Sequence, residues 1–526
     1  MSEDSSTTKP PKGHFYLAGR LFPRVKWWKS PKMRALYFYI LVLILTNTAN
    51  GFDNSMMNGL QTLSYWQEYF DHPKGPTLGL FNCVMSVGAL AGLTILPYML
   101  DHWGRRICLV SGSFFMLLGV GLQSGSINFS MFVAARFILG FGDILVICTA
   151  PLLIAEIAPA QDRAILVTIA GATYHSGAFI AAWTTYGTLK ITSDWSWRAP
   201  SLIQGLFTLI MLAVVWWIPE SPRYYVSKGQ PQKALEILAY YHAEGNEYDE
   251  VVQLEFTEIT TAITMEQNSE HSGSYMDFLR TPGNRKRLLI IITFGLFAQW
   301  SGNGLVSYYL NLIMNSIGIK DADRQLLING ALTSFNLATN LVFSFFVDKW
   351  GRRPIMLVSS AGMMVAFVIW TALSAKYDAN ASLGLGSGYA TSRTSARAFF
   401  TDTVNHLGRS GLIASYTTEI LPYSMRAKGY TIMEFAMYIA LFFNQYVNPI
   451  ALENIRWRYY IFYCCFLAVE VGVIWFFYPE TRYLPLEEIT KLFDGDDIAT
   501  ATNVEMEKLE ENGKVTTVVH IENARA

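Results

Sequence analysis

Charged residues are scarce in this chain of 526 residues, and the charges that are present nearly cancel. Asp, Glu, Lys and Arg make up 15 % of the sequence, hydrophobic residues make up 52 %, and the net charge is −1. A soluble domain covers its surface with more charge than this, so a lipid bilayer is the expected solvent. The charge balance also argues against a nucleic-acid partner, because phosphate binding needs a basic excess.

Cysteine is sparse as well, and no cleavable leader is visible. The five cysteines lie inside apolar runs without metal-ligand or paired spacing, so neither a metal site nor a disulfide framework is expected. The first 34 residues lack the apolar core of a signal peptide but are rich in Lys and Arg. The positive-inside rule therefore predicts a cytosolic N-terminus. Because no nucleophile with a neighbouring base stands out, we expect neither an enzyme nor a bound cofactor.

Long hydrophobic runs are what the chain does have. A membrane-spanning helix needs about 20 predominantly apolar residues. Runs of this kind occupy 36–60, 77–100, 107–125, 130–153, 164–187, 199–218, 288–312, 326–347, 354–375, 430–452 and 459–478. A further crossing is required between 376 and 421 if the basic loops at Arg105, Arg352 and Arg426 are all to be cytosolic.

Three motifs occur twice, in the same order. Asp101-His-Trp-Gly-Arg-Arg106 recurs 247 positions later as Asp348-Lys-Trp-Gly-Arg-Arg353. Glu156-Ile-Ala-Pro159 with Arg163 recurs at an offset of 263 as Glu419-Ile-Leu-Pro422 with Arg426, and Pro219-Glu-Ser-Pro-Arg223 recurs at 260 as Pro479-Glu-Thr-Arg482. Motifs repeated in register near half the chain length indicate two duplicated halves, as in alternating-access transporters.

The repeated loops join consecutive helices on the predicted cytosolic face. Gly permits a tight turn there, and the arginines can pair with carboxylates at neighbouring helix ends. Such pairs would latch an outward-open state; the alternative is that the basic residues are only positive-inside anchors. The predicted cytosolic gate comprises Asp101, Gly104, Arg105, Arg106, Glu156, Arg163, Glu220, Arg223, Asp348, Gly351, Arg352, Arg353, Glu419, Arg426, Glu480 and Arg482.

These motifs resemble the signature of the sugar porter family of the major facilitator superfamily, over about 36–490. Within that family, the segments Gly51–Gln61 and Phe443–Pro449 are similar to the fungal lactose-permease-like and cellodextrin-transporter branch. The resemblance implies an all-α, twelve-helix membrane protein with a central sugar site between two six-helix halves. It also implies a monomeric carrier in the plasma membrane, whose partners are a small sugar, protons and the lipid bilayer.

The resulting domain prediction places a cytosolic helical linker between the halves. The boundaries are 1–34 for the cytosolic N-terminal tail, 35–218 for the N-terminal half, 219–286 for the linker, 287–478 for the C-terminal half and 479–526 for the cytosolic C-terminal tail. The tenth helix is atypical, because 391–411 carries Arg393, Arg397, Asp402 and Arg409. Such charges oppose a lipid-facing helix, so we expect poor insertion there or, alternatively, a water-lined helix.

Asp53 lies deep in the first apolar run, where an ionised carboxylate costs several kcal/mol unless it is paired or hydrated. Arg136 in the fourth run is the candidate partner, and the resemblance implies that the two form a proton switch. The alternative is a purely structural pair. Asp143 follows Arg136 by seven residues, which places it on the same helix face, where it can share the network.

Sugar recognition needs amides and aromatic rings, which pair with hydroxyl groups and stack on the apolar face of the ring. Gln299, Asn303 and Tyr308 lie where the resemblance places the sugar motif, although Ala298 replaces its first Gln and Asn303 falls one place early. We therefore expect a disaccharide or modified sugar, with further wall residues at Trp183, Asn444 and Asn448. The sequence predicts a sugar:proton symporter, with a proton-independent facilitator and a transporter-like sugar sensor as alternatives.

Overall fold

The computed structural model shows a chain that is almost entirely α-helical. It describes residues 11, 13–17, 20–268, 275–316, 319–343, 351–381, 416–417, 419–421, 425–481 and 492–493. A small antiparallel hairpin, β1 (His14–Leu17) and β2 (Arg20–Pro23), precedes the helices, with Phe15 opposite Phe22. The predicted atypical helix at 391–411 lies outside the described residues.

The N-terminal half contains long helices that follow one another through short loops. In chain order they are α1 (Pro31–Leu60), α2 (Ser64–Tyr69), α3 (Gly75–Trp103), α4 (Arg105–Ser124), α5 (Phe129–Ile157), α6 (Arg163–Ala172), α7 (Tyr174–Thr188), α8 (Trp195–Ile203) and α9 (Gly205–Val214). Local sequence sets several starts. Ser30 caps α1 by accepting from the Met33 amide, and Asn128 caps α5 by accepting from the Met131 amide.

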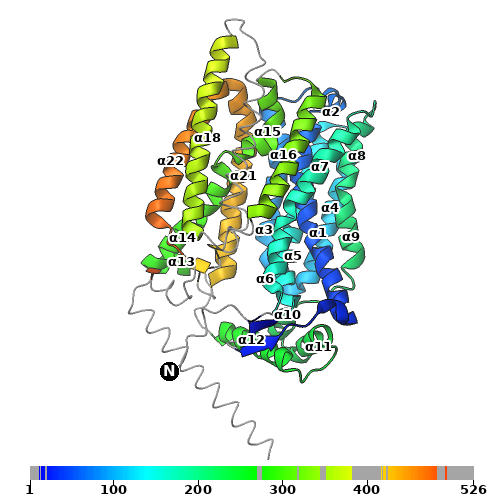
Figure 1. Ribbon diagram of the computed structural model, residues 1–526. Helices are drawn as coiled ribbons and strands as arrows, with labels where there is room; N and C mark the ends of the chain where they lie inside the picture. The colour runs from blue at the N-terminus through cyan, green and yellow to red at the C-terminus, as the bar shows by residue number, and fades with distance from the viewer. Residues whose placement is uncertain are drawn as a thin grey trace, which may run out of the picture.

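Short helices follow and lead into the C-terminal half. They are α10 (Pro222–Ser227), α11 (Pro231–His242), α12 (Glu250–Asn268) and α13 (Asp277–Arg280). The C-terminal half then contains α14 (Pro282–Trp300), α15 (Asn303–Ser316), α16 (Ala322–Phe343), α18 (Arg352–Ala381), α21 (Arg426–Ile455), the 3₁₀ turn η3 (Arg456–Arg458) and α22 (Tyr459–Phe477). In Figure 1, α10 to α12 and the hairpin lie together across one end of the helix bundle, here named the linker end.

In the part of the chain that the structure describes, each predicted apolar run overlaps one or two helices. Within the described residues, ten spans are long and apolar enough to cross a membrane, and three of them, Ile165–Thr188, Trp195–Val214 and Pro282–Asn315, each consist of two consecutive helices. Helix α16, which corresponds to the run 326–347, is 22 residues long but is not among the ten. Three predicted runs are interrupted, because α6 and α7, α8 and α9, and α14 and α15 are separate helices. The apolar composition of the sequence thus predicts where the helices lie but not where they are interrupted.

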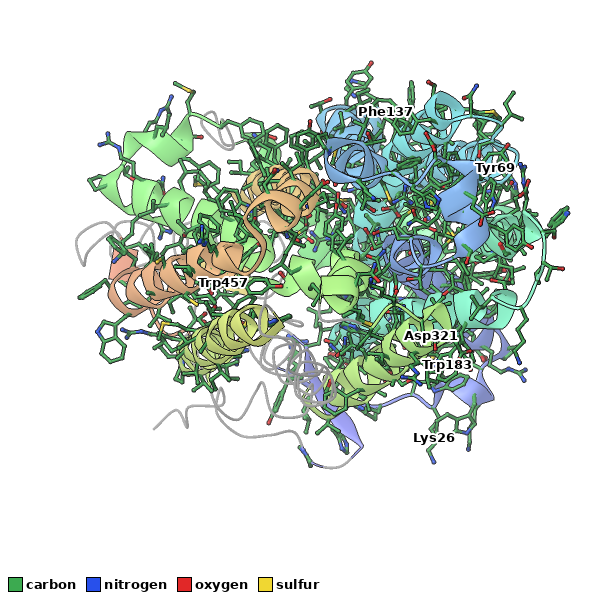
Figure 2. The ribbon with its side chains drawn as sticks, turned by 90° about the horizontal axis from the view of Figure 1, so that it is seen from above. Lys26, Tyr69, Phe137, Trp183, Asp321 and Trp457 are labelled. Carbon is green, nitrogen blue, oxygen red and sulfur yellow. The ribbon has the colours of Figure 1, made fainter. Side chains whose placement is uncertain are left out.

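The two halves lie side by side when the molecule is viewed down the bundle (Figure 2). They meet where α3 packs against α21, α7 against α16 and α1 against α15. One buried apolar cluster crosses this boundary and includes Phe52 and Trp66 from the first half with Tyr308 and Leu326 from the second. Two further apolar clusters each stay within one half. One contains residues of α1 and α5, and the other contains residues of α18 and α22.

Glycine allows α1 and α7 to approach each other closely. A Cβ added at Gly51 would lie 1.9 Å from the Tyr174 carbonyl oxygen, and one added at Gly177 would lie 1.9 Å from that of Thr48. Close packing of small residues is the usual means by which helices associate in lipid.

The hairpin region is fastened to the linker end by polar contacts. Arg20 pairs with the exposed Glu250 of α12 at 3.1 Å. The Val25 amide donates to Gln161 Oε1 at 2.9 Å, and Lys32 Nζ donates to the Glu244 carbonyl at 3.1 Å. The start of the chain therefore joins the α5–α6 loop and the linker helices into one layer.

Candidate transport site and helix-end charge clusters

Asp53 of α1 and Arg136 and Asp143 of α5 are charged side chains buried inside the helix bundle. Asp53 is 1 % exposed, Arg136 is 2 % exposed and Asp143 is 3 % exposed. Arg136 lies within electrostatic range of both carboxylates. Asn50 Nδ2 donates to Asp143 Oδ2 at 2.6 Å. We call Asp53, Arg136 and Asp143 the buried charge cluster.

Asp53 and Arg136 are neighbours but form no ion pair in this conformation. Asp53 Oδ1 and two nitrogens of Arg136, Nε and Nη1, are buried without a hydrogen-bond partner. Tyr308 of the other half is within electrostatic range of Arg136, so the cluster faces the boundary between the halves. Buried charged groups without hydrogen-bond partners are costly in free energy.

Two of the predicted sugar residues, Gln299 and Asn303, flank a break between α14 and α15. The chain turns at Gly302, whose φ of 92° is accessible to glycine at low cost. Gln299 precedes the break and is half-buried; its carbonyl accepts from Asn444 Nδ2 at 3.0 Å. Asn303 follows the break, and its buried Oδ1 has no partner. Discontinuous helices of this kind form substrate sites in many transporters.

Asn444 and Asn448 of α21 belong to a hydrogen-bond network within the second half. Asn448 Nδ2 donates to Asn444 Oδ1 at 2.6 Å, while Asn448 Oδ1 accepts from Tyr459 at 2.8 Å and from Tyr463 at 2.9 Å. Asn448 is fully buried, with its amide already used. Asn444 reaches the helix break through Gln299, so of the two it is the better placed to face a substrate.

Trp183 and several polar residues connect the two halves. Trp183 Nε1 donates to Ser334 Oγ at 3.2 Å, and Figure 2 shows Trp183 at the boundary with the second half. Contacts of the same kind join Asn58 to Asn329, Asn82 to Tyr309, Ser86 to Gln445 and Gln61 to the Tyr308 carbonyl. Sequence reasoning missed all of these except Trp183 and Tyr308. Their signal was present, since amides inside apolar runs need partners in lipid.

A charge cluster at the linker end closes the N-terminal half. Glu220 accepts from the amides of Arg105 at 3.1 Å and Arg106 at 3.0 Å, at the start of α4. Arg105 Nη2 pairs with Glu156 at 3.0 Å. Arg106 donates to the Trp216 carbonyl and lies over its ring. Burial raises the pKa of Glu220, although the backbone donors and Arg105 oppose this effect.

The C-terminal half repeats this cluster contact by contact. Glu480 accepts from the amides of Arg352 and Arg353, each at 3.0 Å, and Arg352 Nη2 pairs with Glu419 at 3.2 Å. Arg353 donates to the Trp475 carbonyl at 2.6 Å and lies over its ring. Each set of pairs stays inside one half. The structure therefore shows these predicted gate residues as two sets of helix-end contacts, each of which binds residues of its own half.

The remaining predicted gate residues differ in their environments. Gly104 and Gly351 have φ of 88° and 93°, as the tight turn requires. Asp101 is exposed and Arg223 is half-buried. Arg426 Nε donates to the Leu421 carbonyl at 3.2 Å, as Arg163 Nε does to Ala158 at 3.4 Å. Asp348 and Arg482 lie outside the described residues.

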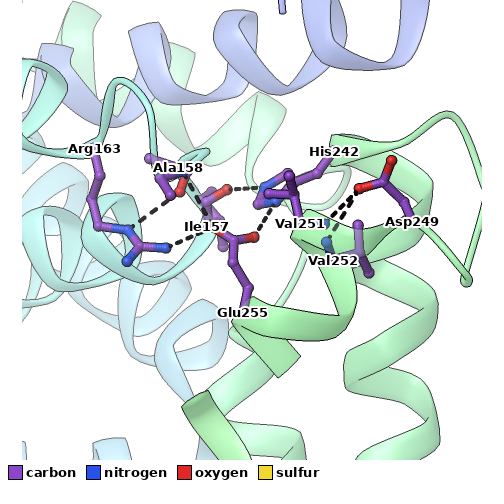
Figure 3. Close-up of polar contacts among 9 residues, drawn as sticks. Ile157, Ala158, Arg163, His242, Asp249, Val251, Val252 and Glu255 are labelled. Atoms are coloured by element: carbon purple, nitrogen blue, oxygen red, sulfur yellow. Dashed lines mark hydrogen bonds and ion pairs between the residues drawn. The ribbon is translucent and has the colours of Figure 1, made fainter. Parts of the chain in front are cut away.

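Arg163 has a second contact that sequence reasoning did not find (Figure 3). Its Nη2 pairs with Glu255 of α12 at 3.3 Å, and Glu255 also accepts from His242 Nδ1 at 2.8 Å. His242 Nε2 lies 3.1 Å from the Ile157 carbonyl, so both ring nitrogens face acceptors. Burial alone would raise the pKa of Glu255, but His242 and Arg163 lower it below its usual range. This contact fastens α12 to the end of α5.

Two duplicated helical halves, a broken helix with one unsatisfied amide oxygen and buried charges in the bundle are together typical of a secondary transporter of the major facilitator type. Residues 39–493 match the family described as "Sugar (and other) transporter", and the chain belongs to that family. It is 26 % identical to the MFS-type transporter criB of Aspergillus cristatus over 85 % of this chain and 91 % of that one. It is 25 % identical to the sugar transporter STL1 of Saccharomyces cerevisiae over 90 % and 84 %.

The fold is that of a solved transporter. The inward-open xylose transporter XylE from E. coli superposes with a TM-score of 0.69 and 21 % identity, covering 87 % of this chain and all of that one. This likeness shows that the chain has the twelve-helix major facilitator fold. The chain is accordingly a multi-pass membrane transporter.

Proposed function

We propose that this transporter moves a sugar together with a proton, by alternating access around the break between α14 and α15. The observation that supports coupling is the buried charge cluster, in which Asp53 and Arg136 lie close together without pairing. A protonated Asp53 needs no cation, whereas an ionised one would be drawn to Arg136. Proton binding can thus decide whether the pair forms.

The proposed orientation in the membrane, and the side that is closed, rest on the basic residues and on the contacts between the halves. The amide contacts of Asn58 and Gln61 lie at the end of α1 that is remote from the linker helices. We take the linker end and both chain termini as cytosolic and the membrane as the plasma membrane, because the basic residues gather at this end. In that orientation the described contacts close the external side.

The proposed substrate is a disaccharide or related sugar, in keeping with the lactose-permease-like and cellodextrin-transporter branch. Gln299, Asn303 and Tyr308 would contact it, and Asn444 and Trp183 would complete the wall. The buried, unpartnered Oδ1 of Asn303 supports this assignment, because a sugar hydroxyl would satisfy it. Asn448 is fully buried and bonded through both its amide nitrogen and its oxygen, which suits a supporting position behind Asn444.

Uptake in a yeast strain without its own sugar carriers tests the proposal. Lactose, cellobiose, glucose and xylose are supplied in turn, with and without a protonophore. We expect a disaccharide to accumulate above its external concentration, and the protonophore to abolish that accumulation. Equal uptake in both conditions, with no accumulation, would contradict symport and leave a facilitator.

A further inference from the structure

The buried charge cluster contains one cation and two carboxylates. We propose that Asp143 is a second member of the proton-coupling site, which balances the charge of Arg136 while Asp53 carries the proton. The proposal rests on the proposed function as a symporter and assigns a residue to its coupling step. It starts from the position of Asp143, which is buried on α5 within range of Arg136.

The hydrogen bonds distinguish the two carboxylates. Asp143 accepts from Asn50 Nδ2 at 2.6 Å, and Asn54 Nδ2 donates to Asn50 Oδ1 at 3.2 Å. The second bond fixes which way the Asn50 amide points, so its NH₂ group faces Asp143. Asp53 Oδ1 has no donor at all. A donor stabilises an ionised carboxylate, so Asp143 is suited to stay charged and Asp53 to take the proton.

Charge counting gives the same assignment. With both carboxylates ionised, the cluster carries a net charge of −1 in a medium where an uncompensated charge is costly. One proton makes it neutral. If Asp143 were absent, Arg136 would be the cation left over whenever Asp53 was protonated, and it would hold Asp53 ionised. Asp143 therefore lets Asp53 gain and lose its proton without leaving Arg136 uncompensated.

The groups around Asp143 come from several helices. Asp53 lies on α1, Cys148 on α5, Tyr174 on α7 and Tyr438 on α21, with Glu434 near Cys148. Tyr308 of α15 is near Arg136. Arg136 is the cation among these neighbours. Because α15 and α21 belong to the second half, the cluster is placed to respond when the halves move apart.

The test uses purified full-length protein in proteoliposomes, with radiolabelled lactose, cellobiose, glucose and xylose as probes. Two rates are measured for each probe: uptake driven by an inward proton gradient, and counterflow exchange without a gradient. We expect Asp143→Asn to lower gradient-driven uptake by about tenfold, the change that corresponds to a charge interaction of one pKa unit. The rate of exchange should change far less. Asp143→Glu retains the carboxylate and should retain gradient-driven uptake.

Glu470→Gln is the matched control, since Glu470 is a fully buried carboxylate bonded to Ser301 and Ser360 in the other half. It should leave the ratio of the two rates unchanged. If Asp143→Asn does not fold, Asn50→Ala decides, because loss of the donor should move the pH profile of gradient-driven uptake. An unchanged ratio in Asp143→Asn, or an unchanged profile in Asn50→Ala, overturns the assignment. A wild type without proton drive would instead overturn the proposed function together with it.

Discussion

Asp53 is buried within electrostatic range of Arg136, but its Oδ1 has no hydrogen-bond donor in this conformation. Asp53→Asn mimics the protonated acid permanently. We expect it to abolish uphill accumulation of sugar while sugar exchange is partly retained, because Arg136 can no longer drive a proton off. Accumulation and exchange in cells measure the two effects. Asp71→Asn, the same change at an exposed position, should leave both intact; continued accumulation by Asp53→Asn would place the switch elsewhere.

Gln299 and Asn303 flank the helix break, and amides there can pair with sugar hydroxyls. Alanine at either position should raise the apparent KM for uptake by about tenfold, in line with the loss of one well-placed hydrogen bond. The amount of membrane-inserted protein should not change. Asn454→Ala at the exposed end of α21 serves as control. Unchanged uptake in both Gln299→Ala and Asn303→Ala would move the site to other helices.

Glu255 should make the docking of α12 sensitive to acid. The pKa of Glu255 is lowered in the folded protein. Glu255 therefore stabilises the fold at pH values above its ordinary pKa of 4.5, and this stabilisation is lost as the pH falls through the lower pKa of the folded state. At pH 7, Glu255→Gln should lower the free energy of unfolding by about 2 kcal/mol, because it breaks a buried ion pair, and this loss is measured as a lower melting temperature. The difference in melting temperature from the wild type should shrink as the pH falls towards 4. Glu250→Gln in the same helix removes only an exposed pair and should have little effect. A difference that is independent of pH would contradict this account.

Among the helices, the crossing of α1 and α7 depends on the absence of a side chain. Gly177→Ala would place a methyl group 1.9 Å from the Thr48 carbonyl oxygen, so the helices must separate. We expect a loss of about 1–3 kcal/mol, measured as a lower melting temperature in detergent. Gly187→Ala in the same helix meets nothing within 4 Å and should be neutral or slightly stabilising. Equal melting temperatures for the two variants would show that the crossing relaxes freely.

The helices themselves were predictable because a backbone in lipid has few alternatives, so each apolar run had to be helical. Their interruptions were not. The run 288–312 reads as one span, yet it breaks at Ser301-Gly302, where Gly302 packs against the Phe367 ring from another helix. Such a break depends on a tertiary neighbour that the local sequence does not reveal. Poor insertion of the charged stretch 391–411, which lies outside the described residues, stays a prediction.

Across the whole molecule, the two helix-end charge clusters are copies of each other. Glu220 and Glu480 each accept from two consecutive arginine amides at 3.0–3.1 Å. Glu220→Gln and Glu480→Gln should therefore each lower the free energy of unfolding by about 1–2 kcal/mol, as for loss of a charged helix cap. The two variants should show similar decreases in melting temperature. Because the clusters lie in separate halves, the double variant should show additive losses. Strong non-additivity would indicate direct coupling between the halves at this end.

The candidate site was only partly accessible to sequence reasoning. Repetition of motifs identified Arg105, Glu156 and Glu220 and their counterparts, since a duplicated pattern is visible without a structure. The pairing of Arg163 with Glu255 could not be predicted from the sequence, because 92 residues separate the two and the linker contains many other carboxylates. The two hydrogen bonds to Asn448 Oδ1 likewise depend on Tyr459 and Tyr463, which reach it only through packing.

The contact between Arg20 and Glu250 also fixes an order of events during synthesis. The partner is made 230 residues after the arginine, which at about 5–20 residues per second takes on the order of 10 to 50 s. Throughout that interval the basic N-terminal segment has no linker helix to bind. It is then free to interact with the membrane surface and set the orientation of the first helix. The N-terminal segment can dock onto α12 only after the ribosome has synthesised the N-terminal half and this helix.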